Sequence, residues 1–205
     1  MIDIVNEINA VRREVANRPA AEGAEVRALR LTRTYNAEVE DVWDALTSEE
    51  RIARWFLPIT GELKAGGSYQ LEGNAGGEIL RCEPPSMFEV TFGDENSIVK
   101  VELSAGENET TVLVLEHTVP AGLFPDSGSL SVGPGWDQAV LGLARHLGGE
   151  SFDDPAAEHD TPESREYAGA SVNAWVAVLE GEGRVEADEL KTAAAAAMEH
   201  YNPSS

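Results

Sequence analysis

Residues 110–147, TTVLVLEHTVPAGLFPDSGSLSVGPGWDQAVLGLARHL, contain the change of periodicity that decides the fold. Up to residue 119 the stretch is dense in apolar and β-branched residues, as in a buried strand. The later apolar side chains recur at helical spacing, at Trp136, Val140, Leu143, Ala144 and Leu147. The sequence therefore predicts a strand, a loop over 120–135, and a helix that buries its apolar stripe against a sheet.

Residues 60–119, upstream of that helix, alternate between apolar and polar side chains with a period of two. Turn-forming residues interrupt this pattern about every 8–12 residues. These interruptions lie at 66–67, 73–77, 84–85, 93–96 and 106–108. Because the connections are too short for parallel crossovers, we expect an antiparallel meander of about six strands.

The segment before the meander adds one more strand and two helices. Residues 26–35 alternate in the same way and predict a strand. Two short helices are expected after it, the first beginning near Val39 and the second carrying Trp55 and Phe56. The expected fold class is therefore α+β, with a curved antiparallel sheet of about seven strands around one long helix.

Both ends of the chain carry additional helical patterns. Over residues 2–16 the apolar residues fall at spacings of four, three and four, which favours an amphipathic helix. After an acidic linker at 150–160, one helix is expected to begin at Pro162 and an alanine-rich helix to cover 187–201. We therefore divide the chain into an N-terminal helix and linker (1–25), a central domain (26–150), and a linker with a two-helix extension (151–205).

The composition is strongly acidic, with 37 acidic against 15 basic residues and a formal net charge of −22. Such a surface repels phosphate backbones and anionic lipids, so we expect neither nucleic-acid binding nor membrane association. No apolar run reaches the length of about 18 residues that a membrane span requires. The first residues are acidic, unlike a signal peptide, and the expected location is the cytoplasm.

Several short motifs occur in the same order as in a known protein family. They are Val42–Thr47, Arg54–Phe56, Gly66–Tyr69, Gly77–Ile79, Glu83–Pro85, Thr110–His117 and Gly135–Trp136. Together they resemble the SRPBCC (START-like, helix-grip) superfamily, in the branch named after homologues of the activator of the heat-shock-protein-90 ATPase. The resemblance covers roughly residues 26–149.

This resemblance implies a helix-grip fold, in which the curved sheet holds the long C-terminal helix and leaves a hydrophobic pocket between them. It implies no particular reaction, because the superfamily includes ligand carriers, cyclases, lipid-transfer domains and co-chaperones. The helices predicted at the two ends of the chain lie outside the part that the family shares.

The side chains expected to line a ligand cavity are mostly aromatic, because tryptophan and tyrosine combine apolar area with a polar group. The candidates are Trp55, Phe56, Tyr69, Phe88, Trp136 and His146. No catalytic residue, metal ligand or cofactor is assigned. The four histidines are scattered without ligand spacing, and the single cysteine, Cys82, has no partner for a disulfide.

Three hypotheses for function follow. The first is a module that binds an apolar or amphipathic small molecule without chemistry. The second is a cyclase- or hydrolase-like enzyme that uses the same cavity, with His146, Tyr69 or Glu78 as acid or base. The third is a chaperone accessory or another protein-interaction module. In any of these, the terminal helices are expected to cap the cavity, to pack on the core, or to form a homodimer.

Overall fold

The computed structural model describes residues 1–19, 25–122, 124–158 and 160–203. The strands are β1 (Val11–Pro19), β2 (Glu25–Tyr35), β3 (Ile59–Gly61), β4 (Ser68–Leu71), β5 (Gly76–Glu83), β6 (Met87–Phe92), β7 (Asp94–Ala105) and β8 (Thr111–Pro120). The helices are α1 (Ile4–Asn9), α2 (Val39–Thr47), α3 (Glu49–Ile52), α4 (Ser129–Leu147), α5 (Pro155–Glu158), α6 (Pro162–Glu182) and α7 (Ala187–Tyr201).

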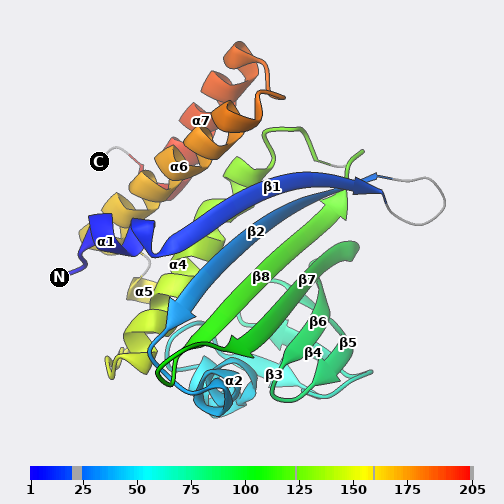
Figure 1. Cartoon of the computed structure of the whole chain (residues 1–205), viewed down its shortest axis with the longest axis vertical. Helices are drawn as coiled ribbons and strands as arrows, with labels where there is room; N and C mark the ends of the chain where they lie inside the picture. The colour runs from blue at the N-terminus through cyan, green and yellow to red at the C-terminus, as the bar shows by residue number, and fades with distance from the viewer. Residues whose placement is uncertain (20–24, 123, 159, 204–205) are drawn as a thin grey trace.

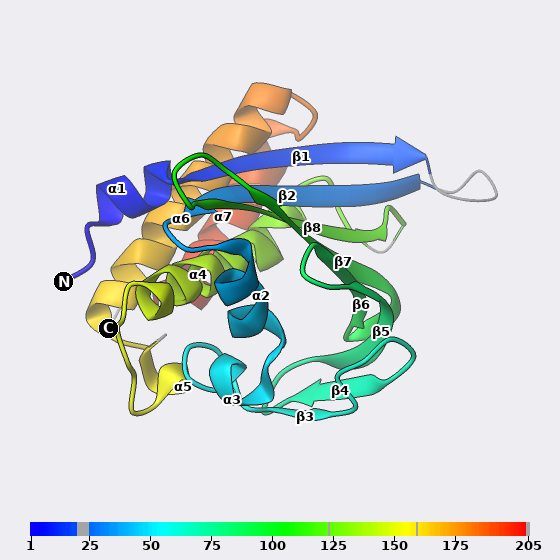
Figure 2. The ribbon, with the colours of Figure 1, turned by 60° about the horizontal axis from the view of Figure 1, so that its bottom comes forward.

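The eight strands form one antiparallel sheet in the order β1-β2-β8-β7-β6-β5-β4-β3. Figure 2 shows the sheet curling from β1 round to β3, with α2, α3 and α4 on its concave side. In Figure 1, α6 and α7 lie beyond α4, on the side of β1 and β2. The expected α+β helix-grip architecture is therefore confirmed, and the predicted meander corresponds to β3–β8.

The concave face of the sheet is apolar because inward residues alternate along each strand. On β8, residues 111, 113, 115, 117 and 119 are all buried, and the residues between them are only half-buried. The register places Leu115 beside Val101 of β7 and Leu31 of β2, so the apolar faces of three strands coincide. Leu130, Val140 and Leu143 of α4 belong to the same core.

The predicted helix over residues 2–16 is wrong beyond Asn9. The following residues form β1, which pairs along its whole length with β2, from Val11 opposite Arg33 to Pro19 opposite Glu25. This edge strand makes the sheet eight-stranded rather than seven-stranded. The side chain of Arg13 is buried in the structure, and Val11, Arg13 and Val15 lie on the same face of the strand.

The long helix α4 begins at Ser129, so the second half of the predicted loop over 120–135 is helical. The sequence around Pro134 is typical of a loop, but in the structure Gly133 allows two helices to pack closely. A Cβ atom at Gly133 would lie 2.5 Å from the indole of Trp175. Helix α6 can therefore approach α4 closely at this point.

Helix α6 begins as the sequence predicts, with Thr161 accepting a hydrogen bond from the backbone N–H of Ser164. Tyr167, Ser171 and Trp175 form its inward face and are fully buried within the chain. The bounds predicted for the alanine-rich helix agree with those of α7. The apolar stripe of α6 therefore packs on the core of its own chain.

A buried ion pair joins β1, α4 and α6. Arg13 contacts Asp137 through two parallel hydrogen bonds, from Nε to Oδ2 and from Nη2 to Oδ1, each 2.9 Å long. Asp137 is fully buried and also accepts hydrogen bonds from the indole N–H of Trp175, at 2.8 Å, and from the Ser171 hydroxyl. Three segments that are distant in sequence are thus tied to one carboxylate.

Candidate functional site

A cavity of about 170 Å³ lies between α4 and the concave face of the sheet. Helices α2 and α3 close one side with Leu46 and Ile52, strands β3–β8 supply the floor, and α4 supplies Val140 and Leu143. The cavity exists because the curved sheet encloses more space than the side chains of α4 fill.

Five of the six side chains predicted for the cavity lie in its lining. They are Trp55, Phe56, Tyr69, Phe88 and Trp136. His146 does not belong to the lining: its ring lies beside Arg51, with Nε2 3.3 Å from Nη2 of the guanidinium group. Burial and the neighbouring cation of Arg51 lower the pKa of His146.

Sequence reasoning did not single out the aliphatic part of the lining. Ile79, Val90, Val99 and Leu115 face the cavity from four neighbouring strands. The signal that identifies them is their inward parity on strands of period two, which is shared by every core residue of the sheet. That parity does not distinguish a residue at a void from one that is packed solid.

The side-chain nitrogen and oxygen atoms in the lining are already hydrogen-bonded to the protein. Two indoles, one phenol and one hydroxyl are involved, and each donates to an acceptor of the chain. The bonds run from Trp55 Nε1 to the carbonyl of Ala45 (2.9 Å), from Tyr69 Oη to the carbonyl of Thr91 (2.8 Å), from Trp136 Nε1 to His117 Nδ1 (3.0 Å), and from Thr47 Oγ1 to the carbonyl of Trp43 (2.8 Å). The cavity therefore presents apolar surface to a guest.

His117 is buried behind Trp136. Since the Trp136 indole donates to Nδ1, the proton of the neutral ring lies on Nε2, which is 2.8 Å from the hydroxyl of Ser97. Burial lowers the pKa of His117 to about 4. The ring is therefore neutral at physiological pH, and both of its nitrogens have partners.

Two titratable side chains occur in the lining described, Tyr69 and Cys82. Burial raises the pKa of Tyr69 to about 12 and also raises the pKa of the Cys82 thiol. Neither group ionises near neutral pH. Glu78, an alternative acid or base in the enzyme hypothesis, lies outside the lining.

Neither a metal-binding cluster nor a membrane-spanning helix occurs in the part of the chain that the structure describes. Within it, no cluster of three or more histidine, cysteine, aspartate or glutamate side chains has the arrangement to hold a metal ion. None of the helices in the same part of the chain combines the length and the apolar character needed to cross a membrane.

Similarity to solved structures extends over most of the chain. The crystal structure of CalU16 from Micromonospora echinospora is 34% identical, with a TM-score of 0.67, and the match covers 83% of this chain and 98% of CalU16. The solution NMR structure of CalU16 is 32% identical with a TM-score of 0.69, and the match covers 84% of this chain and 96% of CalU16. DynU16, described as a protein in the dynemicin biosynthetic locus, is 26% identical with a TM-score of 0.53, over 62% of this chain and 48% of DynU16.

The family comparison agrees with the fold and with the motifs in the sequence. No match was found among curated proteins. The family model described as "Activator of Hsp90 ATPase homolog 1-like protein" matches residues 36–148, which is more than half of the chain. The chain therefore belongs to the family of activator of Hsp90 ATPase homolog 1-like proteins, within the SRPBCC superfamily.

Proposed function

We propose that the protein binds a small apolar or amphipathic molecule by enclosing its apolar part in the cavity between α4 and the sheet. The observation that carries the proposal is the state of the polar groups in the lining. The side-chain nitrogen and oxygen atoms of the lining are already bonded within the chain, so an apolar guest leaves none of them unsatisfied. A guest that buried its own polar groups there would lose its hydrogen bonds to water without replacement.

The size of the cavity sets the size of the enclosed part. An apolar cavity of about 150 Å³ stays dry and takes up benzene, and pockets for drug-sized ligands have about 300–1,000 Å³. A cavity of about 170 Å³ thus suits one aromatic ring or a short branched alkyl group. A larger ligand is expected to leave its polar part outside.

The observations favour binding over catalysis. Acid–base chemistry needs a titratable group within hydrogen-bonding reach of the substrate and with a pKa near the working pH. Tyr69 already donates its proton to the carbonyl of Thr91, and its pKa is about 12. His146, the other candidate, lies outside the cavity beside Arg51.

Similarity to DynU16 supports a small-molecule ligand, since that protein is described as lying in a biosynthetic locus. The chaperone alternative is suggested by the description of the family, but no surface described above favours it. A homodimer through the terminal helices would need faces other than the buried one that carries Trp175.

The proposal can be tested by filling the cavity. Ala139 lies on α4 in the cavity lining, so Ala139→Leu places three additional carbon atoms in the void. Benzene, a single aromatic ring, is titrated into the wild type and the variant, and its binding is followed by saturation-transfer NMR. We expect saturable binding to the wild type and at least about tenfold weaker binding to Ala139→Leu, which corresponds to about 1.4 kcal/mol.

The matched control is Ala196→Leu, the same substitution at an exposed position of α7. It should bind benzene as the wild type does. Equal binding by all three proteins would show that benzene occupies another surface, and the proposed cavity site would then be wrong.

A further inference from the structure

A second hollow, of about 40 Å³, lies next to the cavity along both α4 and β8. On β8, Leu115 lines the cavity, and His117, the next residue on the same face, lines the second hollow. On α4 the change occurs between Val132, which lines the second hollow, and Trp136, which lines the cavity one helical turn later. The two hollows therefore follow each other in the space between α4 and the sheet.

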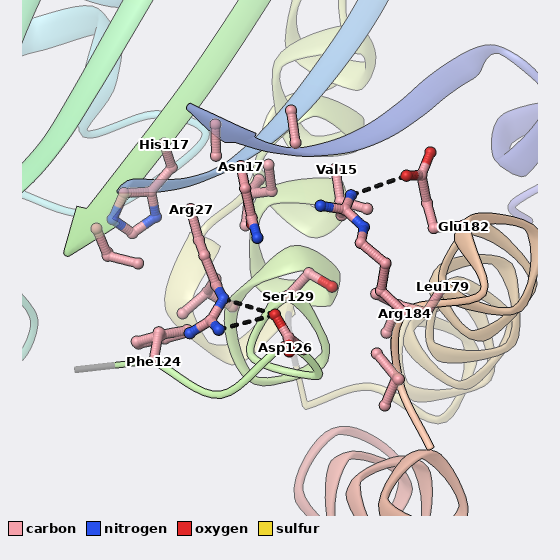
Figure 3. A pocket seen from close by; sticks show the side chains of 16 residues that line it. Val15, Asn17, Arg27, His117, Phe124, Asp126, Ser129, Leu179, Glu182 and Arg184 are labelled. Carbon is pink, nitrogen blue, oxygen red and sulfur yellow. Dashed lines mark hydrogen bonds and ion pairs between the residues drawn. The ribbon is translucent and has the colours of Figure 1, made fainter. Parts of the chain in front are cut away.

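The residues at this boundary form a wall between the two hollows. The indole of Trp136, on the cavity side, donates to Nδ1 of His117, on the other side, at 3.0 Å, and the centroids of the two rings are 5.7 Å apart. Phe92 packs against both rings, with its centroid 5.1 Å from that of Trp136 and 6.0 Å from that of His117. Figure 3 shows His117 at one end of the second hollow and Glu182 at the other.

The position of the Trp136 indole depends on His117. The imidazole is 5% exposed, and its second nitrogen, Nε2, lies 2.8 Å from the hydroxyl of Ser97. Because each nitrogen has its own partner, the ring cannot turn over without losing both hydrogen bonds. His117 is therefore a fixed acceptor, and it holds the indole across the passage from the cavity to the second hollow.

Beyond the wall, the surface of the second hollow is apolar. Leu29 of β2 lies directly opposite His117, and Val119 follows on the same face of β8. The charged side chains of this hollow are already paired with one another. They form the ion pairs Arg27–Asp126 (2.7 Å) and Arg184–Glu182 (2.8 Å). An alkyl chain that passed the wall would thus meet apolar surface.

We propose that Trp136, positioned by His117, limits the length of the molecule that the cavity accepts by closing off the second hollow. The inference rests on the function proposed above and narrows its guest. The wild type encloses a compact apolar group, such as one ring, and excludes an extended alkyl chain from the second hollow.

A comparison of magnitudes favours a wall that stays closed. A water-sized group needs about 10–15 Å³, so the second hollow has room for about three methylene groups. Burying them would raise the affinity about 60-fold, at about fourfold per group. Opening the wall would leave the indole N–H of Trp136 and Nδ1 of His117 buried without partners, and each would lower the affinity about fivefold to 150-fold. The two losses together exceed the gain over most of this range.

The test compares benzene with butylbenzene, which has the same ring and a four-carbon chain. Dissociation constants are measured by NMR titration of the wild type and of Trp136→Ala. Removing the indole should raise the affinity for butylbenzene relative to that for benzene at least about tenfold. Nuclear Overhauser effects from the end of the chain to Leu29 and Val119 should appear in the variant and be absent in the wild type.

Two more variants complete the series. Because removal of a large ring destabilises a core, Trp136→Leu is measured in parallel and should change the affinity ratio in the same direction. His117→Leu keeps the indole but removes its acceptor, and should raise the ratio about threefold or more. An unchanged ratio in His117→Leu would show that His117 does not position Trp136.

The control is Phe88→Ala, which enlarges the cavity at another wall, where the Phe88 ring packs on Trp43 of α2. It should give no effect from the chain to Leu29. Such an effect in Phe88→Ala or in the wild type would overturn the proposal.

The outcomes also separate this inference from the function on which it rests. Failure of benzene to bind the wild type would contradict the proposed function. Benzene binding beside Ile79 in the wild type, together with no contact between the butyl chain and Leu29 in the Trp136 variants, would overturn this inference alone.

Discussion

Replacing Asp137 by asparagine tests whether the buried ion pair holds the terminal segments on the core. The substitution keeps the size of the side chain but removes its charge. Arg13, whose side chain is 5% exposed, then remains buried beside a neutral amide. Breaking a buried pair by removing one partner costs about 3–5 kcal/mol, because the other charge is left uncompensated. We expect a loss of this size in the free energy of unfolding.

For a chain of this length, 1 kcal/mol corresponds to about 2–4 °C in the unfolding midpoint. Asp137→Asn should therefore lower the midpoint by about 6–20 °C. The assay is urea and thermal unfolding followed by tryptophan fluorescence, in which Trp175 reports directly because its indole N–H donates to Asp137.

Two further variants distinguish the loss of the ion pair from a general loss of stability. Arg12→Met removes a charge from the neighbouring position on β1, where the pair with Glu14 is exposed, and should change stability by less than about 1 kcal/mol. The double variant Arg13→Met/Asp137→Asn removes both charges together, while the amide oxygen of Asn can still accept from Trp175 and Ser171, and it should be more stable than Asp137→Asn alone. A loss below about 1 kcal/mol in Asp137→Asn would refute the reasoning.

Two other predictions concern His117 and Gly133. The pKa of His117 is about 4 in the folded protein and 6.5 ordinarily, so the unfolded chain takes up this proton first as the pH falls. At about 1.36 kcal/mol per pKa unit, the free energy of unfolding should fall by up to about 3 kcal/mol between pH 6.5 and pH 4. Urea titrations at each pH should show a smaller fall for His117→Gln. Gly133→Ala places a Cβ atom against Trp175 and should lower the free energy of unfolding by about 1–3 kcal/mol, measured by thermal unfolding. Gly135→Ala, whose new Cβ atom would have its nearest neighbour 3.3 Å away, should lower it by less. Equal effects at the two positions would contradict the close packing of α6 on α4.

The fold was largely predictable because its signals are local. The period-two meander and the alanine-rich helix with its bounds follow from residues close together in sequence. The strand β1 was missed for the opposite reason. Val11 and Val15 fit both a helix and a strand, and the choice depends on Arg13, whose partner Asp137 is 124 residues away. A long-range ion pair of this kind leaves no periodic signal.

The lining of the cavity was also predictable only in part. Aromatic residues expected on inward faces, such as Trp55 and Trp136, lie in its lining. His146 was expected there because of its place near the stripe of α4, but Arg51 of α3 holds it outside.

The central claim is that an apolar molecule enters the space between α4 and the sheet. Its most direct test is the measurement of nuclear Overhauser effects between benzene and the methyl groups of the protein. Ile79 lines the cavity and Leu80, the next residue on β5, is 41% exposed on the outer face. Effects from benzene to Ile79 that saturate with concentration, and none to Leu80, are the expected result. Effects confined to Leu80, or absent from both residues, would contradict the claim.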